Sequence, residues 1–170
     1  MRVLKSLLPA LAALTLAGCA SYHLGPMMDD KTGDKSMEVL PFNNQTLEPR
    51  LGDALTQALR ERLQTDATYH LATHGNGDIV MTGVVRSYRR IGLGYSGSDS
   101  VTPENYRIEV VVHVTAREHD SGKALLDRDV KGHTLVHIGP DLASSERQAL
   151  PLVSEELARN ITELLTEGAW

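Results

Sequence analysis

The chain has 170 residues, of which 41% are hydrophobic, 4% are aromatic and 23% are charged, and its formal net charge is -5. This length corresponds to one domain whose core must be built from aliphatic side chains. The acidic balance argues against general nucleic-acid binding. The single cysteine excludes a disulfide within the chain, so stability must come from the core.

The first residues have the pattern of a bacterial lipoprotein signal peptide. Arg2 and Lys5 precede an apolar run over residues 7–17, which is too short to span a bilayer. Leu16-Ala17-Gly18-Cys19 resembles the lipobox, in which small residues precede a cysteine that is lipidated after cleavage. We therefore expect residues 1–18 to be removed and Cys19 to carry the lipid. The alternative is an ordinary secretory signal with a chance cysteine.

Lipidation would leave 152 residues with a net charge of -7, tethered outside the cytoplasm. Each buried CH₂ contributes about 0.8 kcal/mol, so several acyl chains hold a protein to a membrane firmly. By resemblance to such lipoproteins, Ala20 points to the outer membrane. We expect residues 19–35 to form a polar tether and residues 36–170 to form a single domain.

The first half of this domain predicts a strand and a helix. Residues 37–42 form an apolar run that predicts a strand, with Pro41 at a position that requires no backbone donor. Leucines then recur every four residues from Leu51 to Leu63. This spacing predicts an amphipathic helix over about residues 49–64.

The middle of the domain predicts three strands, because hydrophobic residues there alternate with a period of two. The first strand begins at Asp78 and becomes basic near Arg86, and the glycines and serines of residues 92–100 predict a loop. Residues 106–116 show the cleanest alternation, and residues 126–138 follow as its hairpin partner.

Turn chemistry predicts the register of this hairpin. A three-residue loop over residues 121–123, with Gly122 in the left-handed conformation, would place Val114 opposite Val130. The same register places His113 opposite Lys131 and Arg107 opposite His137. Basic residues would then gather on one face of the sheet.

A final helix is predicted over about residues 144–167. The element order β-α-β-β-β-α predicts an α+β two-layer sandwich, in which a four-stranded mixed sheet has both helices on one face. A right-handed crossover makes the first two strands parallel. The opposite face of the sheet would remain free.

The sequence shows no constellation typical of catalysis. No serine lies in a nucleophile elbow, and the glycines near residue 92 lack the third glycine of a dinucleotide fingerprint. His113, His133 and His137 invite a zinc hypothesis, but solvated surface histidines are the simpler interpretation. We therefore expect a protein that is not an enzyme and has neither a metal nor a cofactor.

Several motifs resemble the LptE family, the lipoprotein subunit of the outer-membrane lipopolysaccharide translocon. They are the lipobox with residues 20–24 after it, Val39-Leu40-Pro41-Phe42-Asn43-Asn44-Gln45-Thr46 before a helix, Asp78-Ile79-Val80, Tyr106-Arg107-Ile108, and Ser144-Ser145-Glu146-Arg147-Gln148-Ala149. The resemblance implies a plug that sits inside a large β-barrel, helps it assemble and contacts lipopolysaccharide. It also implies an outer-membrane location on the periplasmic side.

The residues on the free face of the sheet suit the ligand that this resemblance implies. Arginine binds two phosphate oxygens at once, so basic residues among apolar ones suit lipid A. The candidate lipopolysaccharide contacts are Arg86, Arg107, Lys131 and Arg90. A solvated face with scattered charges is the alternative interpretation. Two other classes also remain open: an envelope scaffold that binds a protein without lipid transport, and a glycan-associated enzyme.

Overall fold

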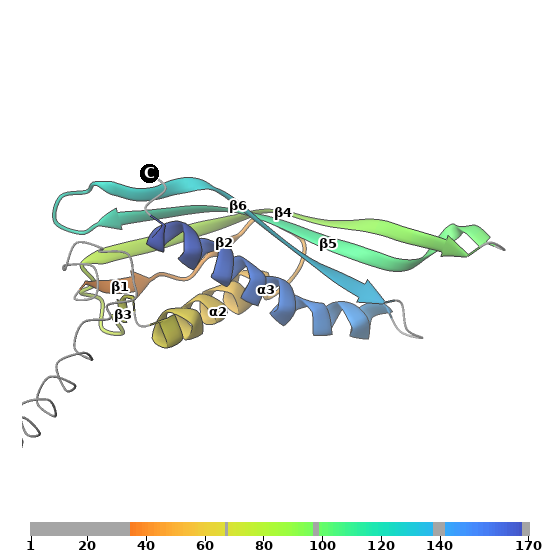
Figure 1. The fold of residues 1–170 in the computed structure, drawn as a ribbon, viewed down its shortest axis with the longest axis horizontal. Helices are drawn as coiled ribbons and strands as arrows, with labels where there is room; N and C mark the ends of the chain where they lie inside the picture. Colours follow the sequence, from red (N-terminus) through yellow and green to blue (C-terminus); the bar gives the residue numbers. More distant parts are fainter. Residues whose placement is uncertain (1–34, 67, 97–98, 138–141, 168–170) are drawn as a thin grey trace, which may run out of the picture. The chain divides into compact units, whose positions relative to one another are not determined.

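A computed structural model describes residues 35–66, 68–96, 99–137 and 142–167. They belong to the compact unit Lys31–Trp170, in which two helices cover one face of a mixed β-sheet (Figure 1). Neither described helix is long and apolar enough to cross a membrane. The expected signal peptide, Cys19 and the tether up to residue 34 lie outside the described residues.

The sheet has six strands in the described residues, where four were expected. β1 (Ser36–Val39) pairs in parallel with β4 (Ile79–Ser96), as the crossover rule predicts. β4, β5 (Asp99–Glu118) and β6 (Ala124–His137) form the expected antiparallel meander. The additional strands are β2 (Asn43–Asn44) on the edge of β4 and β3 (His70–Leu71) on the edge of β1.

Proline divides the first predicted strand into β1 and β2. The amide of Leu40 donates to Met81 O (3.0 Å), and that of Gln45 donates to Val85 O (3.0 Å). Pro41 lies between them and is exposed, so its missing N–H removes no bond from the ladder. The expectation for Pro41 is confirmed, although the strand is interrupted there.

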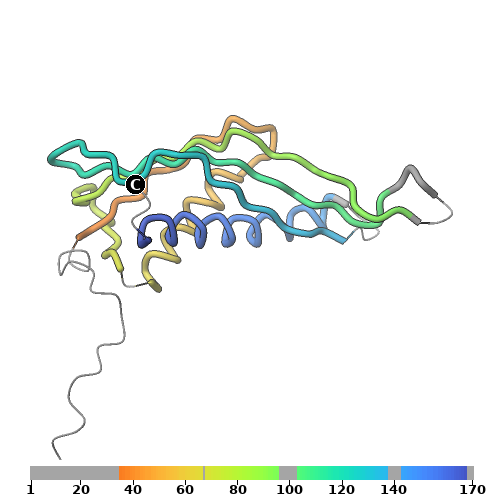
Figure 2. Tube along the Cα trace, turned by 45° about the horizontal axis from the view of Figure 1, so that its top comes forward, coloured from red at the N-terminus to blue at the C-terminus, as the bar shows by residue number. Residues whose placement is uncertain are grey.

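Both predicted helices are present on the same side of the sheet (Figures 1 and 2). α2 (Leu51–Asp66) begins two residues later than expected, after Arg50 with its positive φ of 67°. α3 (Leu142–Thr166) runs through Pro151 as one helix. The leucine stripe of α2 and one apolar face of α3, which includes Leu157, are buried against the sheet in one core.

Two glycines allow the layers to approach closely. A Cβ on Gly83 of β4 would lie 2.3 Å from ring carbon Cε2 of Phe42. A Cβ on Gly132 of β6 would lie 2.5 Å from Cγ of Leu157 on α3. Real Cβ atoms do not come this close, so a side chain at either position would push the packed residue aside.

The predicted hairpin register is wrong by two residues. Val114 lies opposite Arg128, and Val112 lies opposite Val130. The turn is longer than expected, because the amide of Glu118 donates to Lys123 O (3.0 Å) across the loop 119–122. A bulge follows near Leu125, since Ala116 pairs with Leu126 but Arg117 pairs with Ala124. The left-handed Gly122 (φ 67°) is confirmed.

The predicted loop at residues 92–100 is also corrected, because β4 continues through Gly92 and Gly94 to Ser96. β4 pairs with β5 as far as Ser96 and Asp99, whereas β6 stops at His137 opposite Asn105. A second bulge interrupts β4 at Arg86, between the pairs Val85–Val112 and Ser87–Val111. This extra residue reverses which face each later side chain of β4 occupies.

Candidate functional site

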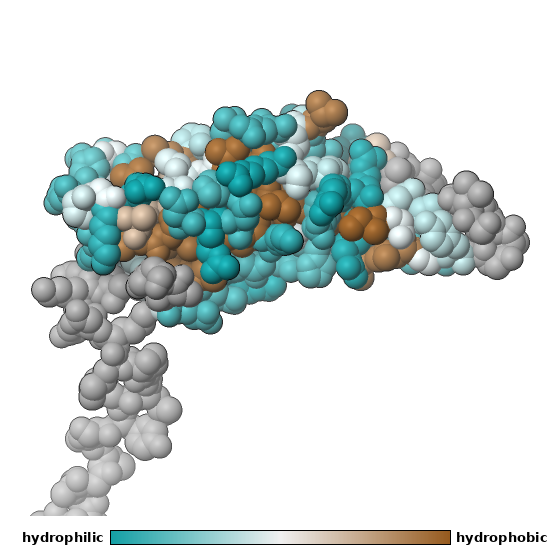
Figure 3. Space-filling view, turned by 90° about the horizontal axis from the view of Figure 1, so that it is seen from above, coloured by the Kyte–Doolittle hydropathy of each residue, from teal (hydrophilic) through white to brown (hydrophobic). Residues whose placement is uncertain are grey.

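The open face of the sheet is the side turned away from α2 and α3. Ile79, Met81 and Val85 are buried on the helix side, as predicted, and Arg86 lies on the open side. Figure 3 looks onto this face and shows hydrophilic residues broken by hydrophobic patches. Charged residues from β4, β5 and β6 therefore share one surface.

A chain of ion pairs crosses this surface. Asp129 lies opposite His113 and contacts its Nδ1 (2.9 Å), and it also accepts from Arg86 NH1 (2.8 Å). Asp127 contacts the other ring nitrogen of His113 (3.2 Å) and accepts from Arg117 (2.9 Å). The acidic residues of β6 thus pair with Arg86, one of the four predicted cations, and with Arg117.

The observed hairpin register explains why Asp129 contacts His113 and Arg86. With the two-residue shift, His113 faces Asp129 rather than Lys131, and Arg107 faces Leu135 rather than His137. The predicted opposition of like charges is therefore absent: a carboxylate faces His113, and an aliphatic side chain faces Arg107. A hydrogen bond from His113 is the main cause that lowers the pKa of Asp129, and the charge of Arg86 adds to it.

A second pair lies further along the same face. Arg89 of β4 pairs with Glu109 of β5, directly opposite in the register. This hydrogen bond is the main cause that lowers the pKa of Glu109, and the charges of Lys131 and Arg107 lower it further. Arg89, and not Arg90, is therefore the arginine that joins the open face.

Arg107 and Lys131 are the two predicted lipopolysaccharide contacts whose side chains have no partner among the described residues. Neither side chain makes an ion pair or a hydrogen bond with another described residue. Arg107 lies between Ile91 (40% exposed) and Leu135 (63% exposed) in one cross-strand row. Lys131 lies opposite the half-buried Val111. Unpaired cations and exposed aliphatic side chains thus alternate on this part of the face.

Arg90 lies on the helix side of the sheet. Its guanidinium is 3.0 Å from Glu146 of α3 and stands over the ring of Tyr88, 5.9 Å from the centroid. Burial raises the pKa of Tyr88 to about 12, and Glu146 and Glu48 add to this shift. Burial, together with the charge of Glu146, also raises the pKa of Glu48.

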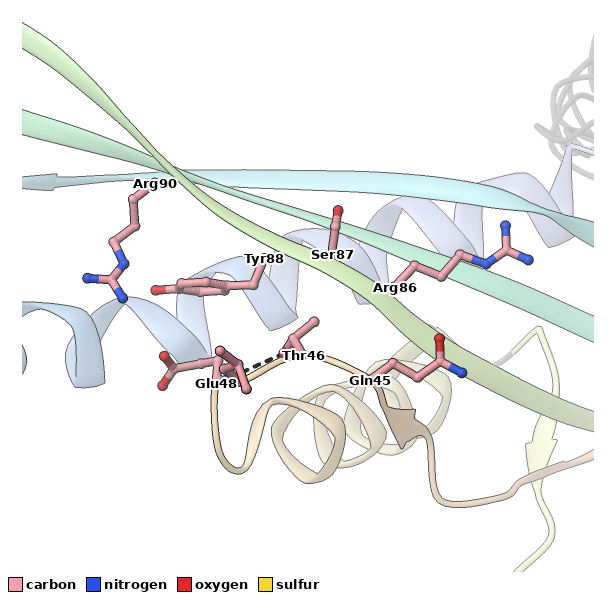
Figure 4. Close-up of a pocket in the computed structure, with 8 residues that line it drawn as sticks. Gln45, Thr46, Glu48, Arg86, Ser87, Tyr88 and Arg90 are labelled. Atoms are coloured by element: carbon pink, nitrogen blue, oxygen red, sulfur yellow. Dashed lines mark hydrogen bonds between the residues drawn. The ribbon is translucent and has the colours of Figure 1, made fainter.

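Glu48, Tyr88 and Arg90 border an open depression of about 420 Å³ where β2 leaves the edge of β4 (Figure 4). The Tyr88 hydroxyl is buried and has no hydrogen-bond partner in the described part of the chain. Figure 4 shows Arg86 pointing away from Tyr88, while Arg90 points toward Glu48. Of the four predicted cations, only Arg86 and Arg90 border the depression, so it is not a common binding site for all four.

The structure divides the predicted contacts into three groups. Arg107 and Lys131 share the open face without partners, Arg86 shares it but is bound to Asp129, and Arg90 lies on the other side. Cys19 lies outside the described residues. The exposed Ile91 was not among the predicted residues, and only its register with Arg107 identifies it.

The three histidines of the zinc hypothesis have separate partners. His113 contacts Asp127 and Asp129, His133 contacts Glu156 (3.3 Å), and His137 Nδ1 lies 2.8 Å from Asn105 Oδ1. The described residues contain no group of three or more His, Cys, Asp or Glu side chains arranged to hold a metal.

Solved structures share this fold at low sequence identity. A hypothetical protein from Chlamydia trachomatis matches with a TM-score of 0.56 and 10% identity, covering 79% of this chain and 97% of that one. A minor lipoprotein from Acinetobacter baumannii matches with a TM-score of 0.54 and 15% identity, covering 79% and 94%. A protein from Xanthomonas campestris matches with a TM-score of 0.54 and 12% identity, covering 79% and 87%.

The comparison with curated proteins gave no significant match. A family model gives the more specific result. The model of LptE, described as "Lipopolysaccharide-assembly", matches residues 35–165, which is more than half of the chain and includes every described strand. The chain therefore belongs to the LptE family of lipopolysaccharide-assembly proteins.

Proposed function

We propose that this protein is an outer-membrane lipoprotein that plugs a large β-barrel and takes part in lipopolysaccharide transport to the cell surface. Family membership supports a role in lipopolysaccharide assembly. Cys19 would carry the lipid anchor and hold the domain on the periplasmic side of the outer membrane. The protein would act by binding and assembly, without catalysis.

The observation that carries the proposal is the pair of unpaired cations on the open sheet face. Arg107 and Lys131 are separated by about 13 Å along the strand direction, since Val111, the partner of Lys131, lies four positions after Arg107. They could therefore contact two phosphates of lipid A at once, with Arg107 as a bidentate donor. Ile91 and Leu135 flank Arg107 and offer aliphatic surface to acyl chains.

The experiment is a charge reversal at these two positions. Arg107→Glu with Lys131→Glu should reduce lipopolysaccharide crosslinking or binding at least tenfold, because two attractive contacts become repulsive. The matched control is Lys123→Glu with Arg159→Glu, which makes the same charge change in the hairpin turn and on the exposed side of α3. Thermal unfolding checks that both variants fold. Wild-type binding by the folded Arg107/Lys131 variant would refute the role of this face.

A second candidate is an envelope scaffold that binds a protein without lipid transport. The observation in its favour is the ion-pair chain through Asp129 and Asp127, which removes charge that a lipopolysaccharide site would use. Purification from membranes separates the two candidates. A complex with a large outer-membrane barrel supports the plug, and a partner other than a barrel supports the scaffold.

A further inference from the structure

The outer edge of β4 is left without a partner over half of its length. β1 pairs with residues 79–81 and β2 pairs with residues 84–85, and the structure describes no strand beyond Arg86 on that side. An edge strand presents a row of unpaired N–H and C=O groups that another chain can bind. This edge is therefore open to strand addition.

At the opposite edge of the sheet, side chains of α3 bind backbone groups of β6. Where α3 crosses β6, Asn160 donates its side-chain amide to Lys131 O (3.0 Å). Glu156 accepts the backbone N–H of His133 (2.7 Å). Helix side chains thus occupy outward backbone groups of β6, whereas no comparable contact with a described residue covers β4 after Arg86.

A hydrogen-bonded loop directs the chain itself away from this edge. After Gln45 bonds to Val85 O, the side chain of Asn44 accepts from the amide of Thr46 (3.0 Å) and donates to Glu48 O (2.7 Å). These bonds turn the backbone away from β4 and leave Leu47 fully exposed at the apex of the loop. The depression described above lies in the corner that results (Figure 4).

The arginines at this edge are more exposed than the carboxylates that pair with them on β5 and α3. Arg89 is 63% exposed while its partner Glu109 is 24% exposed, and Arg90 is 48% exposed while its partner Glu146 is 15% exposed. In both pairs the guanidinium is the outer group, and the carboxylate lies further inside, on β5 or α3. An incoming chain would therefore meet arginine before it meets glutamate.

We propose that the edge of β4 from Arg86 to Gly92 binds an extended, acidic segment of a partner protein as an additional strand. Backbone groups of the segment would pair with the free edge of β4, and its carboxylates would contact Arg89 and Arg90. A side chain of the segment would lie in the depression beside Leu47. The site uses the sheet edge and a polypeptide, so it is independent of lipopolysaccharide binding at Arg107 and Lys131.

Hydrogen exchange tests the strand addition directly. The full lipidated chain in isolated outer membranes is compared with the same chain purified alone in detergent. Amides of residues 86–92 should exchange at least tenfold more slowly in the membranes, while residues 131–133 should change little because α3 already covers them. Equal exchange of residues 86–92 in both samples would overturn the proposal.

Photo-crosslinking identifies the occupant. A benzophenone amino acid replacing Leu47 should crosslink to one extended, carboxylate-rich segment of one partner, and the same probe at the exposed Leu152 of α3 should not. Crosslinks to a second copy of this chain, to lipopolysaccharide, or to a helical segment of another protein would each overturn the proposal.

Charge removal at the edge completes the test, with the partner segment mapped by the crosslink as the probe. Arg89→Gln should weaken binding of that segment about tenfold, since a charge-assisted contact is lost. The control Arg159→Gln removes an arginine of α3 that is 53% exposed, against 63% for Arg89, and should change binding less than twofold. Unchanged binding by Arg89→Gln would overturn the charged contact.

Discussion

Arg86 on β4 and Asp129 on β6 form an ion pair of 2.8 Å that reaches over the intervening strand β5. The residue of β5 beneath them is His113, which contacts the same carboxylate. Three strands are thus joined by one acidic side chain. These contacts stabilise the ionised form of Asp129 in the folded state. Protonation of Asp129 at low pH should therefore destabilise the fold.

We predict that acidification destabilises the fold through these carboxylates. The pKa values of Asp129 and Glu109 are lower in the folded state than their ordinary values. Their contribution to stability is therefore present above the ordinary pKa and is lost as the pH falls through the folded one. The melting temperature should fall between about pH 5 and pH 2.

Asp129→Asn should flatten this dependence, and Asp120→Asn in the exposed hairpin turn is the control. Thermal unfolding followed by circular dichroism across this range is the measurement. An equally steep dependence in Asp129→Asn and in the wild type would contradict the prediction.

Thr56 gives a second prediction, because its buried hydroxyl joins the first strand region to α2. It accepts from the amide of Phe42 (3.0 Å) and donates to Gly52 O (2.7 Å). Thr56→Val keeps the shape but leaves the Phe42 amide without a partner, and it should cost about 1–3 kcal/mol of unfolding free energy. Thr56→Ser retains the hydroxyl and should cost less. Denaturant unfolding of both variants checks this order, and equal losses would argue against the hydrogen bond.

Gly132 gives a third prediction, on the packing of β6 against α3. Gly132→Ala should destabilise the fold by about 1–3 kcal/mol, because the new methyl group would overlap Leu157. Leu157→Ala alone should cost about 2–5 kcal/mol, since it leaves a cavity. The double variant should lose less than the sum of the two, as neighbouring substitutions couple. Additive losses in denaturant unfolding would show that the two sites do not compete for this space.

Cys19 gives a fourth prediction, on the membrane anchor. Cys19→Ala should yield a soluble or uncleaved protein that no longer fractionates with outer membranes, because the acyl chains supply the attachment. Ser21→Ala, two residues further along, is the control and should fractionate as the wild type does. Membrane partitioning of a correctly cleaved Cys19→Ala variant would remove the case for a lipid tether.

Hydrophobic periodicity predicted the four long strand regions, both helices and the free sheet face. It could not predict the hairpin register, because shifts by two residues keep every apolar side chain on the core face. The register is decided by the four-residue turn before Lys123 and by the bulge at Leu125. Neither feature changes the alternation, so the pattern of the sequence contains no signal for them.

The candidate site was predicted in part, for a related reason. Arg107 and Lys131 lie on the predicted face, because the parity of β5 and β6 is unchanged by a shift of two. Arg90 was expected there as well, but the bulge at Arg86 adds one residue to β4 and turns Arg90 toward α3. A bulge at a polar residue in an otherwise regular strand leaves little trace in a single sequence.

The unequal edges of the sheet also limit how the protein can assemble. A head-to-tail array of sheets requires two complementary edges on every molecule, and the contacts of Glu156 and Asn160 with β6 obstruct one of them. Pairing through β4 alone can give only a closed complex, either with one other protein or as a two-fold pair. Contacts made by two polar side chains of α3 thus oppose fibre growth along the sheet.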